Sequence, residues 1–597
     1  MLNNKKVRIG CASAFWGDTN TAAKQLVQDD NIDYLVFDFL SEVTMSILAG
    51  AKMKNNDMGY APDFVRQLSP LLNQIKKKKI KIISNAGGIN PDSCRLALLK
   101  EADKKGIKIN IAVVYGDNLI DKVETLKKSG IKEMESQKLL PEKIMSVNAY
   151  LGAPGIVKAL EEGAEIVITG RCVDSAMVLG PLIHEFKWKP NDYDLLASGS
   201  LAGHIIECGA QCTGGNFTDW KDIQGFENMG FPIVEVLNNG HFTVSKPSGT
   251  GGLISFGTVA EQFLYEIGDP SKYILPDVVC DFTEVTINDL GGNVVFLKGA
   301  KGYPPTDTYK VSATYMDGYQ SIGTLVIGGI NAKKKGELIA NAIIEKTLRI
   351  LAENSLKPFI ESRFDQIGTN WIYGSEKVDS QSKEIVLRIM VRHSKKEALI
   401  LFSRELSQAA TGMPPGVINY LGGRPKVSPS IYLFSFLIQK DEVEVEIELN
   451  NNTSKVQIDK TKYVQNTKQS LKDIPIIEDF RFDSTVPLMK LAFARSGDKG
   501  DHANIGVISR KADYLPFIKN ALTQEAVSSF FKHVLKGSVE SWDVPGISGI
   551  NFLLKNSLGG GGMASLNLDP QGKAYAQQLL EFEIPVPYSL KKKIDKN

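Results

Sequence analysis

The feature that most constrains the fold of this chain is an alternation of apolar, strand-like runs with amphipathic, helix-like stretches near its start. Strands are predicted at 7–10, 33–39, 80–84, 109–114 and 165–169. The helical stretches between them are predicted at 19–28, 64–75, 91–105 and 154–162. Near-continuous apolar strands separated by helices are typical of a parallel sheet covered on both faces. The pattern predicts an α/β domain with a mostly parallel, Rossmann-like sheet, in which ligands bind beyond the carboxyl ends of the strands.

The rest of the chain predicts a β-rich portion and a second, smaller domain. Residues 191–330 combine glycine-rich loops with short β-like runs, and polar residues dominate 449–473 as in an exposed linker. The last hundred residues predict two strands, two helices, a strand, a helix and a strand, an order typical of a small α+β domain. We therefore expect a large domain over 6–450, a linker over 451–486 and a small domain over 487–588.

The amino-acid composition limits the kinds of partner that we expect this protein to bind. The 70 Lys and Arg nearly balance the 68 Asp and Glu, leaving a formal charge of +2 over 597 residues. A net charge so near zero does not support a general nucleic-acid or membrane-surface partner, and any charge-driven recognition must be local. Its six cysteines are sparse, its start has no signal-like apolar run, and no stretch has the ~18 apolar residues of a membrane helix. We expect a cytoplasmic protein with a small-molecule substrate and with no nucleic-acid or membrane partner. The sequence leaves a homo-oligomer open.

Two carboxylates follow the second predicted strand. Asp38 interrupts its apolar run, and Glu42 comes four residues later. On the first turn of a helix this spacing would place both on one side, where repulsion raises one pKa toward the range of a general acid. The structural alternative for Glu42 is a favourable interaction with the helix dipole. Asp38 is the catalytic candidate of the two.

Two further strand ends carry polar, glycine-containing loops. The sequence SNAGGINP places Asn85, Gly87 and Gly88 before a helix, where free N–H groups can hold a phosphate or a carboxylate. TGRCVDS places Arg171 and Asp174 after the fifth strand. Arg171 could bind a carboxylate bidentately, and Asp174 could be its partner or an acid–base group. A tight turn explains the glycines structurally, and a local i, i+3 ion pair explains the other two residues.

The segment HIIECGAQCTGGNF, residues 204–217, contains three side chains of the types that bind metal ions. His204, Cys208 and Cys212 follow one another at spacings of four, which on a continuous helix would place three ligands on one side. Three ligands from one segment are few for zinc, and a glycine interrupts the helix, so we predict no metal site.

The glycine-rich loops also exclude two cofactor classes. No segment has the GxGxxG pattern of dinucleotide binding, and the loop KPSGTGG lacks the ending of a Walker loop. Redox chemistry on a dinucleotide and nucleotide hydrolysis are therefore disfavoured. Gly214 and Gly215, in the loop after Cys212, are predicted to bind the substrate.

The small domain opens with ARSGDKGDHANIG, residues 494–506. So many side chains of mixed charge between two apolar strands exceed what a turn requires. The segment suggests anion binding or acid–base work by His502, and four neighbours are candidates for binding the substrate. These neighbours are Arg495, Asp498, Lys499 and Asp501. The structural alternative is a solvated hairpin with internal salt links.

Six segments, taken in order, resemble one known family. They are RIGCASAFWGD, DYLVFDFLSEVTMSIL, SNAGGINP, TGRCVDSAMVLGPLIHEF, CGAQCTGGNF and ARSGDKGDHANIGVISR. Together they look like the acyclic terpene utilisation protein AtuA family, with a large AtuA-like domain and a small ferredoxin-like one. The resemblance implies a role in the breakdown of acyclic terpenoids such as citronellol and geraniol, through branched-chain acyl-CoA thioesters. It assigns no chemical step, so the roles of individual residues are inferred from the residues themselves.

Within that role we expect an enzyme that adds or removes water on a small carboxylate or an acyl-CoA intermediate. Carboxylates beside anion-binding loops suit proton transfer next to a polarised carbonyl. Asp38 or Asp174 would be the acid–base group, and Arg171 would hold the carboxylate. The N–H groups of Gly87 and Gly88 would stabilise an oxyanion. No cofactor is predicted, except coenzyme A as part of a substrate. The alternative is a non-catalytic ligand-binding or assembly subunit of a catabolic complex.

Overall fold

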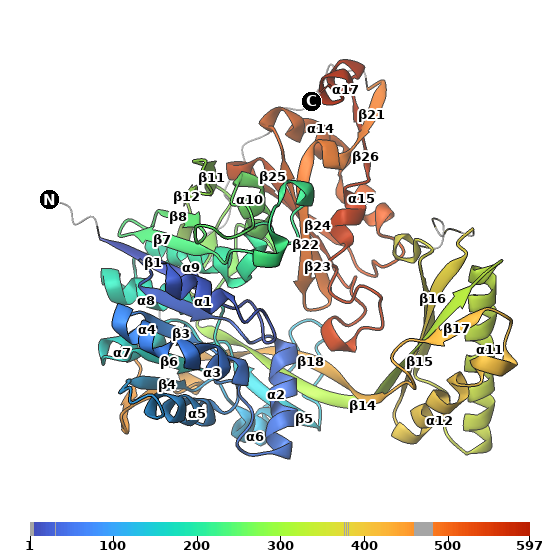
Figure 1. Ribbon diagram of the computed structural model, residues 1–597, viewed down its shortest axis with the longest axis horizontal. Coiled ribbons are helices and arrows are strands. Elements are labelled where there is room, and N and C mark those ends of the chain that lie inside the picture. The colour runs from blue at the N-terminus through green and yellow to red at the C-terminus, as the bar shows by residue number, and fades with distance from the viewer. Residues whose placement is uncertain are drawn as a thin grey trace.

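The computed structural model describes residues 5–29, 31–374, 377, 379, 381–458 and 482–596. Figure 1 shows three parts, which are a large α/β body, a lobe at one side and a C-terminal domain next to the body. The lobe comprises residues 319–428. The predicted linker, 451–486, lies largely outside the described residues, and its beginning forms the strand β20 (Asn452–Lys455).

All five strands predicted near the start of the chain form, and they lie next to one another in one sheet. They are β1 (Lys6–Cys11), β2 (Tyr34–Phe37), β3 (Lys81–Ser84), β6 (Ile166–Thr169) and β4 (Ile111–Tyr115), in this spatial order. Every neighbouring pair among them is parallel; Val36, for example, lies opposite Ile83. The predicted α/β class with a Rossmann-like sheet is confirmed.

The parallel strands make up only the centre of an 11-stranded mixed sheet. Antiparallel strands extend it at both edges, so the sheet is less parallel than the sequence predicts. One edge holds β7 (Ile233–Leu237), β8 (Phe242–Ser245), β12 (Val295–Lys298) and β11 (Thr286–Asp289), and the other holds β19 (Glu446–Leu449) and β20.

Helices cover both faces of this sheet, which explains why its central strands are apolar throughout. Leu35 and Phe37 of β2 pack under the helices of one face, whereas Tyr34 and Val36 pack under those of the other. The first group comprises α1 (Ala22–Gln28), α2 (Glu42–Lys54), α3 (Pro62–Leu68), α4 (Leu72–Lys78) and α5 (Pro91–Asp103). The second comprises α7 (Pro154–Glu161), α8 (Ala176–Phe186), α9 (Tyr193–Glu207) and α10 (Phe256–Leu264). The short α6 (Val123–Lys128) follows β4.

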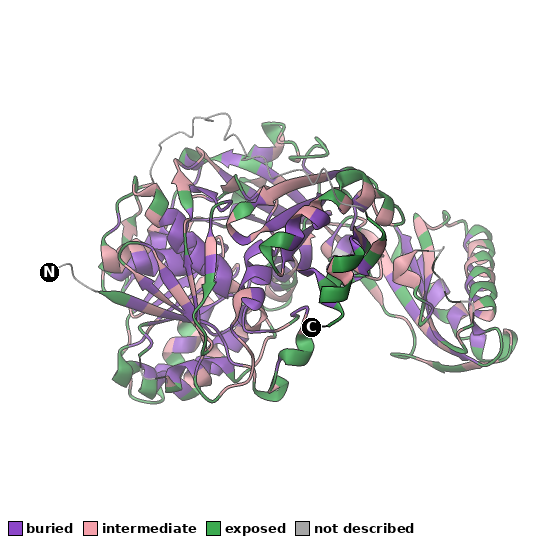
Figure 2. Ribbon diagram, turned by 90° about the horizontal axis from the view of Figure 1, so that it is seen from above, coloured by how far each residue is buried: buried purple, intermediate pink, exposed green. Residues whose placement is uncertain are grey.

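A second sheet connects the body to the lobe. Its longest strand, β14 (Thr308–Gly328), pairs in the body with β5 (Ile144–Ala149) and in the lobe with β16 (Glu384–His393). Its other members are β15 (Glu361–Ile367), β17 (Val417–Tyr420) and β18 (Val427–Gln439). The lobe helices α11 (Ala332–Glu353), α12 (Lys396–Leu406) and α13 (Ala409–Gly412) enclose a separate small core. Figure 2 shows that buried residues are dense in the body and sparser in the lobe.

Three short strands form a further small sheet in the body. They are β9 (Tyr273–Ile274), β10 (Val279–Asp281) and β13 (Lys301–Tyr303). One of the short β-like runs predicted within 191–330 spans 277–287, and its continuity is wrong. The run divides between β10 and β11, which belong to different sheets.

The C-terminal domain is the predicted small α+β unit. Its four-stranded antiparallel sheet has the order β22 (Ala492–Lys499), β23 (His502–Ser509), β25 (Gly549–Leu554) and β24 (Val539–Val544). A separate pair is β21 (Ser484–Pro487) with β26 (Glu583–Val586). Its helices are α14 (Leu515–Ala521), α15 (Gln524–Phe530), α16 (Tyr575–Leu579) and α17 (Tyr588–Ile594). In the described part of the chain, no helix is both long and apolar enough to cross a membrane.

Candidate functional site

Asp38 is a buried carboxyl at the end of β2. Its side chain sits in the loop before α2, and the residue is only 6% exposed. The amide Nδ2 of Asn85, which follows β3, donates to Asp38 Oδ1 at 2.7 Å. Asn85 Oδ1 in turn accepts from the N–H of Phe39 at 2.8 Å, which fixes the orientation of the amide. The two parallel strands thus bring two predicted site residues into direct contact.

Burial and the nearby charge of Asp174 raise the pKa of Asp38 well above its ordinary value. The hydrogen bond from Asn85 and the charge of Arg171 oppose this shift without cancelling it. The predicted cause, repulsion from Glu42 on a shared helical turn, is wrong. The helix α2 begins only at Glu42, whose side chain points to other partners.

Arg171 is a buried cation with donor capacity to spare. Its side chain is 5% exposed, and Nη1 donates to the carbonyl of Leu40 and lies 3.2 Å from Asp174 Oδ1. The guanidinium carbon lies 4.4 Å from the ring centroid of Tyr150. Its Nε is buried and has no hydrogen-bond partner among the described residues. The i, i+3 ion pair considered from the sequence therefore exists, but it leaves this buried N–H of Arg171 unused.

Asp174 is the more accessible of the two acidic candidates. Its side chain is 35% exposed. Burial raises its pKa to about 6, against the opposing charge of Arg171. Both acidic groups therefore have raised pKa values, and the charge of Asp174 disfavours ionisation of Asp38. Such a pair holds a proton at a pH where isolated aspartates have lost theirs.

Two residues that the sequence did not single out complete the surroundings of Arg171. The hydroxyl of Tyr150 donates to Glu42 Oε1, and Lys310 Nζ lies 5.1 Å from the Tyr150 ring centroid. Burial alone would raise the pKa of Glu42, but the charges of Arg171 and Lys310 and this hydrogen bond lower it to about 2. Lys310 is exposed, yet desolvation by its surroundings lowers its pKa. Its ammonium group is thus open to a solute while protein groups crowd it.

The C-terminal domain contributes Lys499 to the same place. Its Nζ lies 5.4 Å from the ring centroid of Tyr273, and its charge acts on both Asp174 and Lys310. We call the seven residues assembled here the charged cluster. They are Asp38, Glu42, Tyr150, Arg171, Asp174, Lys310 and Lys499.

His502 lies at the edge of the cluster. Its Nδ1 accepts from the N–H of Asn556 at 3.0 Å, so Nε2 is the nitrogen that carries the proton in the neutral ring. Nε2 donates to Glu135 Oε1 at 2.9 Å. This hydrogen bond lowers the pKa of Glu135, which also interacts with the charge of Lys310. No contact joins His502 to Asp38 or Asp174 among the described residues.

The glycines predicted to bind an anion have structural roles in the described fold. The N–H of Gly87 donates to the carbonyl of Thr169 at 3.1 Å, and that of Gly88 to the carbonyl of Asn85 at 3.2 Å. A Cβ at Gly87 would lie 2.6 Å from the Thr169 oxygen, so close backbone packing requires glycine there. The N–H groups predicted to stabilise an oxyanion already have partners.

Gly214 and Gly215 belong to a tight turn rather than to the charged cluster. Their N–H groups donate to the carbonyls of Gln211 and Ala210, at 3.3 and 2.8 Å. A Cβ at Gly214, whose φ is +107°, would also lie 2.7 Å from Ile223 Cδ1. The predicted role in substrate binding has no support in this geometry.

Three of the charged residues in the 494–506 segment bind protein partners. Arg495 Nη1 donates to Gln211, and its Nη2 lies 3.1 Å from the fully buried Glu261 of α10. Asp498 pairs with Lys573 at 3.2 Å. Asp501 Oδ1 accepts from the N–H of Gly560 at 2.6 Å. Of the residues of this segment that are predicted to bind the substrate, only Lys499 reaches the charged cluster.

The three residues considered as metal ligands, His204, Cys208 and Cys212, do not lie on one continuous helix. The helix α9 ends at Glu207, so Cys208 and Cys212 do not continue the face that carries His204. His204 Nδ1 lies 3.3 Å from Glu207 Oε1, and its Nε2 lies 3.0 Å from the carbonyl of Phe263. Within 5–29, 31–374, 377, 379, 381–458 and 482–596, no group of three or more His, Cys, Asp or Glu side chains could hold a metal ion.

Comparison with known proteins gives two matches along the chain. The profile of the acyclic terpene utilisation family protein AtuA matches residues 7–449, and that of the AtuA ferredoxin-like domain matches residues 486–585. The first match alone covers well over half of the chain, and both confirm the resemblance and the ferredoxin-like domain inferred from the sequence. No match was found among curated proteins or among solved structures.

Proposed function

The chain belongs to the acyclic terpene utilisation family AtuA, whose membership supports a role in acyclic terpene utilisation, and we propose that within this role it is a hydratase or dehydratase. Its substrate would be a branched carboxylate or acyl-CoA thioester. The observation that carries the proposal is the pair Asp38 and Asp174 beside Arg171. Both acids have raised pKa values, and the arginine keeps an unused N–H. Paired acids of this kind, beside a buried cation, suit proton transfer at a carbon activated by a carbonyl.

In the dehydration direction, Asp174 as a carboxylate removes the proton from the carbon next to the carbonyl. The electron pair of that C–H bond forms the C=C bond, and the C–O bond of the neighbouring hydroxyl breaks. The protonated Asp38 gives its proton to the departing oxygen, which leaves as water. Passage of the proton from Asp174 to Asp38 restores the starting state, and hydration is the same path reversed.

The cations account for substrate binding in this proposal. Arg171 and Lys310 would hold the carboxylate or the thioester carbonyl and stabilise the negative charge that develops on its oxygen. Both lie against Tyr150, at 4.4 and 5.1 Å from its ring centroid, so the aromatic ring restrains them together. Glu42 stays ionised at neutral pH because its pKa is about 2, and it balances their charge.

The direct test follows the mass of each member of a substrate panel. Purified protein is incubated with saturated and unsaturated branched acyl-CoA thioesters and free acids. We expect the gain or loss of one water from at least one of them. Asp38→Asn should reduce the rate by about 10²- to 10⁴-fold, the usual contribution of general acid–base catalysis, with little change in melting temperature. Exposed Asp57→Asn is the matched control.

Two outcomes would contradict the proposal. A fully active Asp38→Asn protein removes this residue from the mechanism. No mass change across the panel, with and without added divalent metal, favours the alternative of a non-catalytic subunit. Co-purification with partner chains would then be the next measurement.

A further inference from the structure

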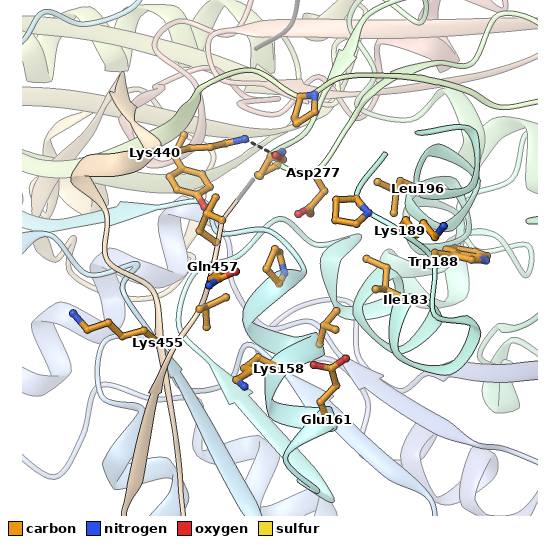
Figure 3. A pocket seen from close by; sticks show the side chains of 18 residues that line it. Lys158, Glu161, Ile183, Trp188, Lys189, Leu196, Asp277, Lys440, Lys455 and Gln457 are labelled. Carbon is orange, nitrogen blue, oxygen red and sulfur yellow. Dashed lines mark hydrogen bonds between the residues drawn. The ribbon is translucent and has the colours of Figure 1, made fainter. Parts of the chain in front are cut away.

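A second cavity lies on the other side of the strand that carries Lys310. Its volume is about 390 Å³, within the range of small-molecule sites. Tyr309, the neighbour of Lys310 on β14, lines this cavity, because successive side chains of a strand point to opposite faces. Figure 3 shows side chains converging on it from α7, from the connection between α8 and α9, and from residues 455–458.

The walls of the cavity combine apolar side chains with charged ones on a rigid backbone. Pro154, Val157, Lys158 and Glu161 lie at the i, i+3, i+4 and i+7 positions of α7, which places them on one face of that helix. Pro154 is one of four prolines in the lining, and proline offers no N–H and a fixed φ. The others are Pro190, Pro276 and Pro305.

Trp188 provides the largest apolar surface. Its indole Nε1 donates to the carbonyl of Asn238 at 3.1 Å, so its one polar atom is already satisfied. The ring is 5% exposed, and Ile183 and Leu196 line the cavity beside it. A ligand body that contacts these groups must itself be apolar, since they offer it no hydrogen bond.

The charged groups of the lining are mainly cationic. Lys158, Lys189 and Lys455 surround the cavity together with a single exposed acid, Glu161 (Figure 3). Lys455 is already paired with Glu444, so Lys189 and Lys158 are the cations that a ligand would meet. Lys158 also pairs with Glu162 at 3.2 Å, but at 39% exposure such a pair is weak and can exchange partners. The inner carboxylate of Asp277 accepts from the N–H of Ala153 at 2.9 Å.

From this arrangement we infer that the cavity binds a small amphipathic carboxylate. Its apolar body would lie between Trp188 and Tyr309, and its anionic head would meet the lysines of the rim. The site does not depend on the proposed hydratase function, because it shares no residue with the charged cluster. The charge of the rim excludes an amphipathic amine of the same length.

The test measures binding of octanoate, 1-octanol and octylammonium to the full chain by isothermal titration calorimetry. We expect octanoate to bind about fivefold more tightly than octanol, as a partly exposed ion pair allows, and octylammonium to bind most weakly. Val157→Trp fills the cavity from the half-buried face of α7 and should abolish octanoate binding. Lys189→Glu should weaken octanoate about fivefold and leave octanol unchanged.

Two control variants separate this cavity from its surroundings. Lys334→Glu reverses an exposed charge in the lobe, outside the lining, and Lys310→Gln removes a cation from the charged cluster. Both should leave octanoate affinity within about twofold of the original. The inference is overturned if folded Val157→Trp protein binds octanoate normally, if Lys310→Gln abolishes binding, or if octylammonium binds as tightly as octanoate.

Discussion

Arg171 and Arg495 are both buried arginines that the sequence predicts as substrate-binding groups, yet their surroundings differ. In the C-terminal domain, Arg495 directs Nε, Nη1 and Nη2 to side chains and a carbonyl of the body. In the body, Arg171 keeps a buried Nε without a partner among the described residues. An arginine whose three nitrogens all have protein partners holds two parts of the protein together, whereas one with a buried nitrogen that has no partner is available to a ligand.

The largest expected effect in this comparison is on stability. Arg495→Met leaves Glu261 buried without its cation, which should cost about 3 to 5 kcal/mol of unfolding free energy. Urea unfolding measures the loss. Glu261→Gln in the same chain should recover more than half of it, because the uncompensated charge is then removed. A single variant that unfolds at the original urea concentration would contradict the structural role of Arg495.

For Arg171 the effect should fall on activity instead. Arg171→Lys keeps the charge but loses the planar set of donors, so kcat/KM should fall by about 10²-fold, as when one donor to a developing oxyanion is lost. The measurement pairs steady-state kinetics on the substrate found in the mass assay with urea unfolding. The prediction is contradicted if Arg171→Lys loses as much stability as Arg495→Met while kcat/KM of the folded fraction stays unchanged. Arg171 would then have a structural role, as Arg495 has.

A third prediction uses the raised pKa of Asp174. Its folded pKa of about 6 lies above the ordinary value of 3.8, so between these pH values the folded protein binds the proton more tightly than the unfolded chain does. Stability contributed by this group is therefore full below that window and is lost as the pH rises through it. Asp174→Asn should make the decline of unfolding free energy between pH 4.5 and pH 7 shallower. Parallel curves for the two proteins would refute the raised pKa.

The sequence predicts those parts of the fold whose strands and loops have a recognisable pattern of apolar and polar residues. The five parallel strands are apolar on both faces, and polar loops with candidate site residues follow three of them, so the sequence locates the strands and the site beside them. The strand β14 has no such pattern, because its burial alternates and half of it lies in the lobe. Its full length was therefore missed, and so was β5, which pairs with it.

The same reason explains which site residues were missed. Tyr150 and Lys310 come together because β5 and β14 are paired, a contact between positions far apart in sequence. Neither lies in a glycine-rich loop. Conversely, Gly87 and Gly215 have the expected composition of an anion site, but their N–H groups bind backbone carbonyls. A glycine-rich composition predicts a turn. Whether the N–H groups of that turn are free to bind a ligand depends on the packing around it.

The smallest expected effect concerns Lys499, through which the C-terminal domain reaches the charged cluster. It is exposed, and its Nζ lies against the ring of Tyr273 rather than in an ion pair among the described residues. Lys499→Gln should raise KM about fivefold with kcat unchanged, because an exposed charge contributes up to ~1 kcal/mol to anion binding. Lys490→Gln, at an exposed position of the same domain, is the control. Equal KM values for both variants would confine the site to the body and leave the C-terminal domain only the structural role that Arg495 exemplifies.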